Sequence, residues 1–401
     1  MKIMTVAVSP YLLTSAGRLN QSILKFFLSK GHTVSSAVWG HDTGYFMSDE
    51  IDGKYYYEED STKICELFPF INSPEIASVS VYESMKKFMP DIVISIGNEN
   101  DVAFVCAIKD TLPGFFKWIG ILTSQSPMST VGVDVCDSMD FIIVTTSEGL
   151  REVKKVSSTS SSFINPGYNN DVFTLSENVP DKFSIIANLR NNKLSNIPAL
   201  LSALSMLKDY RNDFEAYLHT NIDDSASGFD IRSLVSRYGL SKCLRLPMPY
   251  SCSHYGISDL KMRDEYCSAS VYVDPSMDSL TGACLLEAMG CGCVPITVKA
   301  GACWDILQNN IDGCFASSSP FVDERGDNLD VISDYDLFQK LKGWYDFFHN
   351  SHIDGKIKLR EKCADISKKY KRKFFEDNIY DIVLSLYDRK RIVELAVDCI
   401  N

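Results

Sequence analysis

The sequence predicts an α/β protein in which two Rossmann-like domains face a central cleft. Short, almost continuously apolar segments alternate with segments whose apolar residues recur at helical spacing, which is typical of parallel sheets covered by helices on both faces. This alternation occurs in two successive blocks, and 401 residues are enough for two domains. Hydrophobic residues make up 45% of the chain and charged residues 23%, the balance of a folded protein rather than a disordered one.

The first block predicts four strands and two helices, in the order strand, helix, strand, strand, strand, helix. The first helix ends at Lys30-Gly31, a typical helix stop, and the second begins near Glu148. The expected strands are 3–8, 33–38, 91–96 and 141–145, and the first helix covers 19–29.

The second block predicts five strands and three helices. Each strand is a short apolar run, and one helix ends at Gly239. The strands are 184–187, 214–219, 244–246, 271–273 and 294–297, and the helices are 197–207, 231–238 and one that contains 285–289.

Proline, glycine and asparagine cluster between residues 166 and 180, which places a hinge there. We therefore expect a first domain over 1–170 and a second over 178–375, with a helix over about 376–401 that crosses back onto the first domain. In open α/β sheets, ligands bind beyond the carboxyl ends of the strands, so the cleft is where we expect chemistry.

Charge and cysteine content exclude several classes of protein. The formal net charge is −12, which argues against a protein that grips nucleic acid mainly through phosphates. The 13 cysteines form no C-x-x-C pair, so we expect reduced, mostly buried thiols rather than disulfides or a metal site. No apolar run reaches 18 residues, and the first one ends at Ser9-Pro10, so we expect neither a transmembrane helix nor a secretion signal, and a cytoplasmic protein.

The segment 272–296 is the richest in chemistry. It predicts a strand, a turn, a helix that starts near Leu280–Gly282, a tight glycine turn and another strand. The free N–H groups and positive dipole at a helix start suit a diphosphate. Glu287 lies on this helix among apolar residues, where a carboxylate is costly unless it is hydrogen-bonded. Two interpretations stay open: a structural glutamate, or an acceptor of hydrogen bonds from ribose hydroxyls.

This segment resembles the signature of the retaining nucleotide-sugar glycosyltransferases of glycosyltransferase family 4, which have the GT-B fold. The matching positions are Gly282, Leu285, Leu286, Glu287, Ala288, Met289, Gly292 and Pro295. The segments 140–147, 165–173, 233–240 and 262–270 are also similar to the family, so the resemblance covers nearly the whole chain. It implies that the second domain binds the nucleotide sugar and the first binds the acceptor.

The resemblance implies specific roles in the signature. Glu287 would bind the donor ribose, and the backbone N–H groups of Leu280, Thr281 and Gly282 would meet the diphosphate or the sugar. The family's other acidic residue lies eight positions earlier, where this chain has Ser279, and the neighbouring Asp278 is a candidate substitute.

Two further loops contain residue types similar to those of the family. Arg190 and Lys193 would stabilise the negative charge of the departing diphosphate without a metal, although their spacing is shorter than usual. The alternative is that they are plain surface charges beside a helix start. In the first domain, Ala16-Gly17 replaces a glycine pair that lets the backbone approach the donor, and a turn alone would also explain Gly17.

Other polar residues carry weaker hypotheses. Ser124 or Gln125 could line the sugar pocket. The loop that contains Asn98, Glu99 and Asp101 could meet the acceptor or simply be solvated. His219 and His254 are left unassigned. The basic run 368–373 is either a solvated helix face or a contact for an anionic acceptor, a lipid surface or nucleic acid, which would also make the protein peripheral to a membrane.

The expected function is therefore that of a hexosyltransferase of the EC 2.4 class. It would move a sugar from a UDP- or GDP-linked donor to a hydroxyl acceptor with retention, using no metal or resident cofactor and no stable protein partner. Two alternatives remain: a viral-type transferase that acts on a hydroxylated DNA base, and a nucleotide-sugar-binding protein that has lost turnover because of Ser279.

Overall fold

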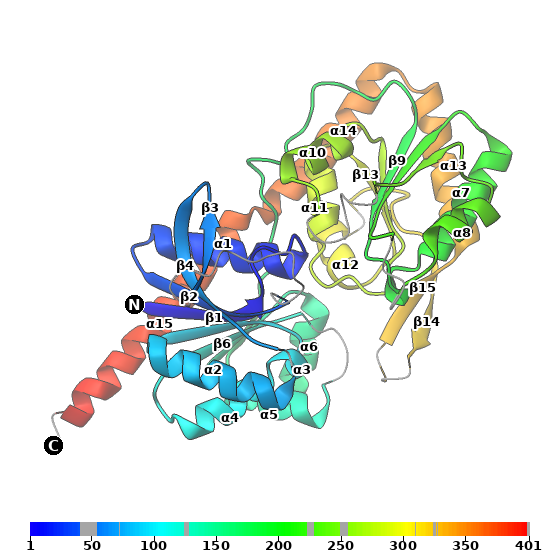
Figure 1. Ribbon diagram of the computed structural model, residues 1–401. Helices are drawn as coiled ribbons and strands as arrows, with labels where there is room; N and C mark the ends of the chain where they lie inside the picture. The colour runs from blue at the N-terminus through cyan, green and yellow to red at the C-terminus, as the bar shows by residue number, and fades with distance from the viewer. Residues whose placement is uncertain are drawn as a thin grey trace. The chain divides into compact units, whose positions relative to one another are not determined.

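The computed structural model describes residues 1–398 except 41–53, 72, 124–127, 223–227, 249–255, 309, 324, 325 and 327. The chain divides into two compact units (Figure 1). Unit 1 comprises Met1–Asn165 and Lys373–Asn401, and unit 2 comprises Pro166–Arg372. Each unit is an α/β body with its own parallel sheet, which confirms the predicted fold class.

Unit 1 is built on an eight-stranded sheet in the order β3-β4-β2-β1-β5-β6-β7-β8. All neighbours pair in parallel except β3 and β4, which form an antiparallel hairpin at one edge. The strands are β1 (Lys2–Val8), β2 (Thr33–Trp39), β3 (Tyr55–Glu59), β4 (Thr62–Pro69), β5 (Ile92–Gly97), β6 (Lys117–Leu122), β7 (Phe141–Val144) and β8 (Ser161–Phe163).

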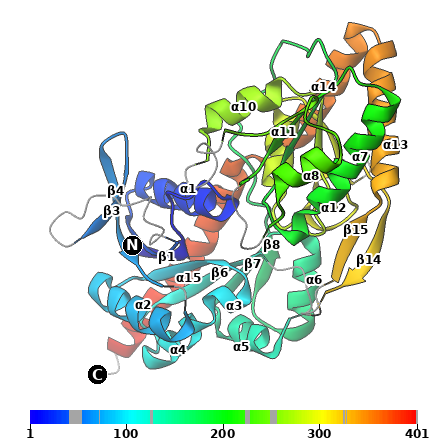
Figure 2. The same ribbon diagram turned by 45° about the vertical axis from the view of Figure 1, so that its right-hand side comes forward.

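Helices cover both faces of this sheet, so its strands are buried on both sides. Along β5, Ile92, Ile94 and Ile96 enter one hydrophobic cluster while Val93 enters the other, as alternating side chains require. α1 and α15 cover the first face, and α2 to α5 cover the second (Figure 2). The helices are α1 (Ser15–Ser29), α2 (Pro74–Phe88), α3 (Glu99–Val102), α4 (Phe104–Thr111), α5 (Thr130–Ser138), α6 (Ser147–Val156) and α15 (Arg372–Asp398).

Unit 2 is built on a five-stranded parallel sheet in the order β11-β10-β9-β12-β13, with a separate antiparallel hairpin, β14-β15. The strands are β9 (Ser184–Asn188), β10 (Glu215–His219), β11 (Leu244–Arg245), β12 (Val271–Asp274), β13 (Val294–Thr297), β14 (Ser318–Val322) and β15 (Asn328–Ile332).

The helices of unit 2 lie on both faces of its sheet, with α7, α8 and α13 on one face and α10, α11 and α14 on the other (Figures 1 and 2). Their apolar residues join one continuous core with the strands. The helices are α7 (Ile197–Tyr210), α8 (Ile231–Arg237), α10 (Asp259–Cys267), α11 (Ala283–Gly290), α12 (Gly301–Leu307), α13 (Asp334–Asn350) and α14 (Ile353–Ser367), with short 3-10 helices η1 (Lys193–Ser195) and η2 (Lys368–Tyr370).

The strands predicted from apolar runs all occur, with ends shifted by at most one residue. The β3-β4 and β14-β15 hairpins were not predicted, nor were the strands β6 and β8. The hairpins lack a long apolar run, since β14 is largely exposed and β3 carries Tyr55, Tyr56 and Tyr57 before two glutamates.

Asp140 ties together three elements of unit 1. Its carboxylate accepts hydrogen bonds from Lys109 Nζ at 2.6 Å, from Lys117 Nζ at 3.0 Å and from the Trp118 N–H at 2.9 Å. Burial opposes ionisation, but these three donors outweigh it and hold the pKa of the Asp140 carboxyl below its ordinary value.

We expect Asp140→Asn to lower the free energy of unfolding by about 1.5–3 kcal/mol at pH 7, the scale of hydrogen bonds to a charged group. A depressed native pKa stabilises the fold above the ordinary aspartate pKa of about 3.9, and this contribution is lost as the pH falls through the native value. Urea unfolding of both proteins between pH 7 and pH 3.5 should therefore show a shrinking difference. A difference that stays constant with pH would contradict this account.

Candidate functional site

The candidate site lies at the carboxyl edge of the unit 2 sheet. There β9 ends at Asn188, β12 at Asp274 and β13 at Thr297, and each strand runs into a loop. These loops contain the polar residues that the sequence singled out in the second domain. Because the strands are parallel, their carboxyl ends bring the loops to one edge.

Backbone hydrogen bonds to other elements hold the loop between β12 and α11 in place. The Met277 N–H donates to the Leu194 carbonyl at 2.8 Å, and the Met277 carbonyl accepts from the Asp330 N–H at 3.1 Å. The Ser279 carbonyl accepts from the Ala302 N–H at 2.8 Å. The loop is therefore fixed to η1, to β15 and to the first turn of α12.

Gly282 sets the start of α11. Its φ of +64° lies in the left-handed region, and a Cβ on it would approach Ile306 Cδ1 to 2.4 Å. The Gly282 carbonyl accepts the first helical bond, from the Leu286 N–H at 2.9 Å. Gly282, the N-cap residue, has no side chain to cap the helix, and the Ala283 N–H donates to the Thr281 hydroxyl at 3.4 Å. The predicted helix start at Leu280–Gly282 is thus confirmed, with a first turn suited to an anion.

Glu287 lies on the second turn of α11 and is only 4% exposed. Its neighbours Leu286 and Ala288 are fully buried in the core of unit 2. Asp274, at the end of β12, is a second acid near the same loop. Burial raises the pKa of the Asp274 carboxyl, although it accepts a hydrogen bond from the Ser276 N–H at 3.1 Å.

Ser279 is part of a chain of neutral hydrogen bonds. The Thr297 hydroxyl donates to Cys303 Sγ at 3.1 Å, and the Cys303 thiol donates to Ser279 Oγ, also at 3.1 Å. Ser279 is 6% exposed, while Asp278 next to it is half-buried. Cys303 was missed by the sequence analysis, because nothing local in the sequence links it to a residue 24 positions away.

Arg190 and Lys193 are both exposed, on the loop that follows β9. In the ranges that the structure covers, neither side chain forms an ion pair with a carboxylate, so both charges face solvent. The loop beneath them is held by Asn191, which is buried. The Asn191 amide exchanges two hydrogen bonds with the backbone of Phe229, at 2.8 and 3.0 Å.

Asn191 was also missed as a site-building residue. The consecutive asparagines at 191 and 192 were the available signal, since Asn side chains commonly bond to backbone in loops. Thr220, just after β10, is a further candidate at the same edge. It is buried, and its hydroxyl has no hydrogen-bond partner among the described residues.

Gly17 lies in unit 1, in the first turn of α1. A Cβ on it would lie 2.1 Å from the Leu12 carbonyl oxygen and 2.9 Å from that of Ser9. The tight packing of the loop before α1 therefore requires glycine by itself. This observation favours the structural interpretation of Gly17 and does not test the ligand contact.

The loop after β5 is structural in part. Asn98 caps α3, accepting from the Asp101 N–H at 2.9 Å, while the Asp101 carboxylate accepts from the Asn98 N–H at 3.3 Å. Glu99 between them is buried. His219 Nδ1 lies 3.0 Å from the Tyr217 hydroxyl. The candidates Ser124, Gln125 and His254 lie outside the described residues.

The basic run 368–373 is partly used inside the fold. Lys368 pairs with Asp365 at 2.7 Å, and the Arg372 guanidinium donates to the Gly167 carbonyl at 3.1 Å. Across the described ranges, no ion pair involves Lys369, Lys371 or Lys373. These three lysines are what remains for an anionic acceptor.

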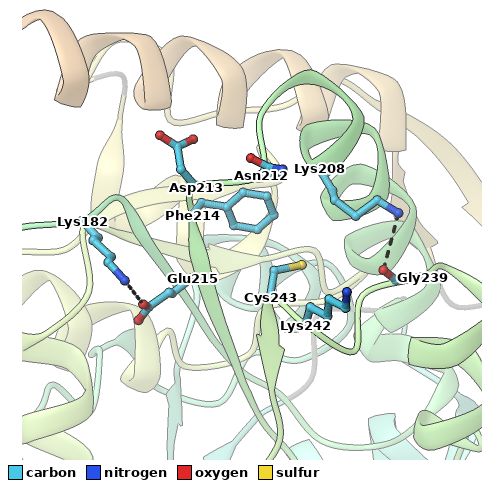
Figure 3. Close-up of a pocket in the computed structure, with 9 residues that line it drawn as sticks. All are labelled: Lys182, Lys208, Asn212, Asp213, Phe214, Glu215, Gly239, Lys242 and Cys243. Atoms are coloured by element: carbon cyan, nitrogen blue, oxygen red, sulfur yellow. Dashed lines mark hydrogen bonds and ion pairs between the residues drawn. The ribbon is translucent and has the colours of Figure 1, made fainter.

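A cavity of about 570 Å³ lies at the opposite, amino end of β9, β10 and β11 (Figure 3). Two of its three lysines are already bonded to other residues of the lining. Lys182 pairs with Glu215 at 2.7 Å, and Lys208 donates to the Gly239 carbonyl at 3.4 Å, as the dashed lines show. It lies away from every predicted site residue, so we do not assign the donor to it.

Comparisons with known proteins identify the fold. No family model and no curated protein sequence matches the chain. Among solved structures, it is similar to a sucrose-phosphate synthase from Thermosynechococcus elongatus, with 15% identity, coverage of 97% of this chain and 100% of that one, and a TM-score of 0.73. It is also similar to HepE from Anabaena in complex with UDP, with 12% identity, coverage of 96% and 100%, and a TM-score of 0.68.

A glycosyltransferase from Rickettsia africae matches with 15% identity, coverage of 96% of this chain and 98% of that one, and a TM-score of 0.70. These likenesses span both chains almost completely. They show that the protein has the GT-B fold, as its resemblance to GT-B glycosyltransferases implied.

No helix among the described residues is long and apolar enough to cross a membrane. No group of three or more histidine, cysteine, aspartate or glutamate side chains in those ranges is arranged to hold a metal ion.

We expect Gly282→Ala to lower the free energy of unfolding by about 1–3 kcal/mol, because alanine must adopt a left-handed conformation and collide with Ile306. Gly343 is the matched control. It lies inside α13, and nothing lies within 4 Å of the position of an added Cβ. Gly343→Ala should therefore stabilise the protein by about 0.5–1 kcal/mol in the same urea titration. Equal effects at the two sites would show that the turn at Gly282 is not strained.

Proposed function

We propose that this protein transfers a sugar from a nucleotide-diphosphate sugar to a hydroxyl acceptor. The observation that carries the proposal is the carboxyl edge of unit 2: the glycine-initiated start of α11, the buried Glu287 on that helix, and the exposed cations Arg190 and Lys193 in a GT-B fold. Solved proteins of the same fold bind UDP or a UDP-sugar analogue. The donor is UDP- or GDP-linked in this proposal.

The chemistry follows from charge. When the glycosidic bond breaks, negative charge gathers on the departing diphosphate. The N–H groups at the start of α11 and the two cations stabilise that charge from fixed positions, so the transfer needs no obligate metal or resident cofactor. Glu287 holds the ribose hydroxyls. Retention of the anomeric configuration rests on the resemblance of segment 282–295 to the family 4 signature.

Ser279 supports a second candidate function, nucleotide-sugar binding without transfer. Its hydroxyl is buried and bonded to Cys303, so this position brings no charge to the donor sugar. Incubation with a panel of nucleotide sugars separates the two candidates. Slow release of the nucleoside diphosphate supports the transferase, whereas saturable binding with no release over many hours supports the binding protein.

We expect Glu287→Gln to weaken UDP or GDP binding by about 1–3 kcal/mol, the scale of hydrogen bonds to a charged group. Calorimetric titration of the nucleoside diphosphate measures the change. Glu265→Gln is the control, because Glu265 lies in the same unit, on α10, but is paired with Arg245. Unchanged affinity in Glu287→Gln would mean that the ribose lies elsewhere.

Arg190→Ala and Lys193→Ala should each lower the rate of donor cleavage by about 10²–10³-fold, the cost of losing one group that stabilises developing charge. Both side chains are exposed and outside any ion pair in the described ranges, so the free energy of unfolding should change by less than about 0.5 kcal/mol. Lys242→Ala, an exposed lysine at the opposite end of the sheet, should leave the rate unchanged. If Arg190→Ala and Lys193→Ala cleaved the donor as fast as Lys242→Ala, the two cations would have no role in the mechanism.

A further inference from the structure

A smaller cavity of unit 2, of about 290 Å³, lies between the segment that precedes β9 and the helix α14. The segment contributes residues 175–177 and 179 to its lining, and α14 contributes Ile357, Arg360 and Glu361. None of these residues belongs to the loops at the carboxyl edge of the sheet, so this cavity is separate from the candidate site.

The apolar part of the lining comes from both walls. On α14, Ile357 is three and four positions before Arg360 and Glu361, so the three side chains share one face of the helix. Ile357 is 36% exposed, and Leu175 and Val179 line the other wall. The cavity therefore offers an aliphatic group a surface on which to be removed from water.

Arg360 is the buried charge of the cavity. It is 1% exposed, and its guanidinium donates to the carbonyls of Ala269 and Cys291, each at 3.1 Å, and of Cys267 at 3.4 Å. Its Nε atom is also buried and has no hydrogen-bond partner among the described residues, and no carboxylate there pairs with it. Because a buried donor is normally satisfied, and because a carboxylate is its strongest partner, this wall suits an anionic group.

Leu175 lies beside that guanidinium. A Cβ built on Gly292 would lie 2.5 Å from Leu175 Cδ1 and 3.1 Å from Arg360 Cζ, so both atoms adjoin the same point. Leu175 is only half-buried and belongs to a segment without helix or strand. A shift of this one side chain, rather than of the core, would let a carboxylate reach the guanidinium.

Two acids supply the opposite charge. Glu177 comes from the segment before β9 and Glu361 from α14, so each wall carries one. Both residues are exposed, and in the part of the chain that the structure describes neither forms an ion pair. Carboxylates accept hydrogen bonds and an ammonium group donates three, so these acids suit a primary amine.

We propose that this cavity binds a free α-amino acid with an aliphatic side chain. Arg360 binds the carboxylate, Glu177 or Glu361 binds the ammonium group, and the side chain packs against the three apolar residues of the lining. Small-molecule sites commonly measure about 300–1,000 Å³, so this volume, at the low end, suits an amino acid better than a nucleotide sugar. The proposal concerns this cavity alone and holds whether or not the protein transfers a sugar.

The first test titrates the wild-type protein calorimetrically at pH 7 with four compounds. They are L-leucine, glycine, isocaproate, which is leucine without its ammonium group, and isoamylamine, which is leucine without its carboxylate. L-Leucine should bind saturably, and each of the other three should bind at least ~10-fold more weakly, because each lacks one of the three recognised groups. Any of them binding as tightly as L-leucine, or L-leucine failing to saturate the protein by about 20 mM, would overturn the proposal.

The second test changes the acids. The double variant Glu177→Gln with Glu361→Gln should bind L-leucine at least ~10-fold more weakly without losing affinity for isocaproate, which has no ammonium group. Asp365→Asn is the control, since Asp365 is an exposed acid of the same helix outside the lining, and it should bind L-leucine as wild type does. An unchanged affinity for L-leucine in the double variant, or an equal loss for both ligands, would contradict the proposal.

The contact with Arg360 is tested without changing it. Arg360→Ala would remove three hydrogen bonds that hold the fold, so a loss of binding in that variant would have two explanations. Isoamylamine isolates the contact instead, because it keeps the ammonium and aliphatic groups of leucine and lacks only the carboxylate.

Discussion

The candidate site depends on three backbone hydrogen bonds that fix the loop between β12 and α11. Met277 is bonded to Leu194 and Asp330, and Ser279 to Ala302, so the loop is attached to elements from before and after it in the chain. These bonds use no side chain, and the loop's path therefore does not depend on the side chains at its surface. The chain reaches Gly282 in a direction that continues into α11 only if this residue adopts the left-handed conformation. The position of the α11 N-terminus, and with it any anion bound there, follows from this loop.

Charge is distributed around that loop according to the cost of burial. Ser279, Cys303 and Thr297 lie inside, and their hydrogen bonds are neutral. Arg190 and Lys193 lie outside, on a loop that the buried amide of Asn191 holds. An unpaired charge lowers stability strongly in the core and very little in water. The cations therefore stay available to a ligand with little loss of stability. Glu287 is a carboxylate within the core, and burial also raises the pKa of the Asp274 carboxyl at the same loop.

The sequence predicted those features whose cause is local. The isoleucines and valine of 92–96 are buried on both faces of a parallel sheet, and a continuous apolar run is the direct signature of that environment. Gly282 and Glu287 stand close together in a strand-turn-helix pattern. By contrast, Cys303 acts on Ser279 and Asn191 acts on Phe229 through contacts between residues 24 and 38 positions apart. Such pairs have no spacing signature, and the two hairpins lack the apolar runs on which the strand prediction depended.

The two ends of the unit 2 sheet differ because its strands are parallel. Helices that follow the strands begin at the carboxyl edge and return toward the amino edge, so their positive ends gather at one edge and their negative ends at the other. At the amino edge, Lys208 is held by carbonyls at the end of α8, and Lys182 is paired with Glu215. The lysines at the amino edge therefore neutralise negative charge that the fold already supplies there. At the carboxyl edge the fold supplies positive charge, and Arg190 and Lys193 add to it. In the proposed function, topology as well as side chains would stabilise a dianionic diphosphate at that edge.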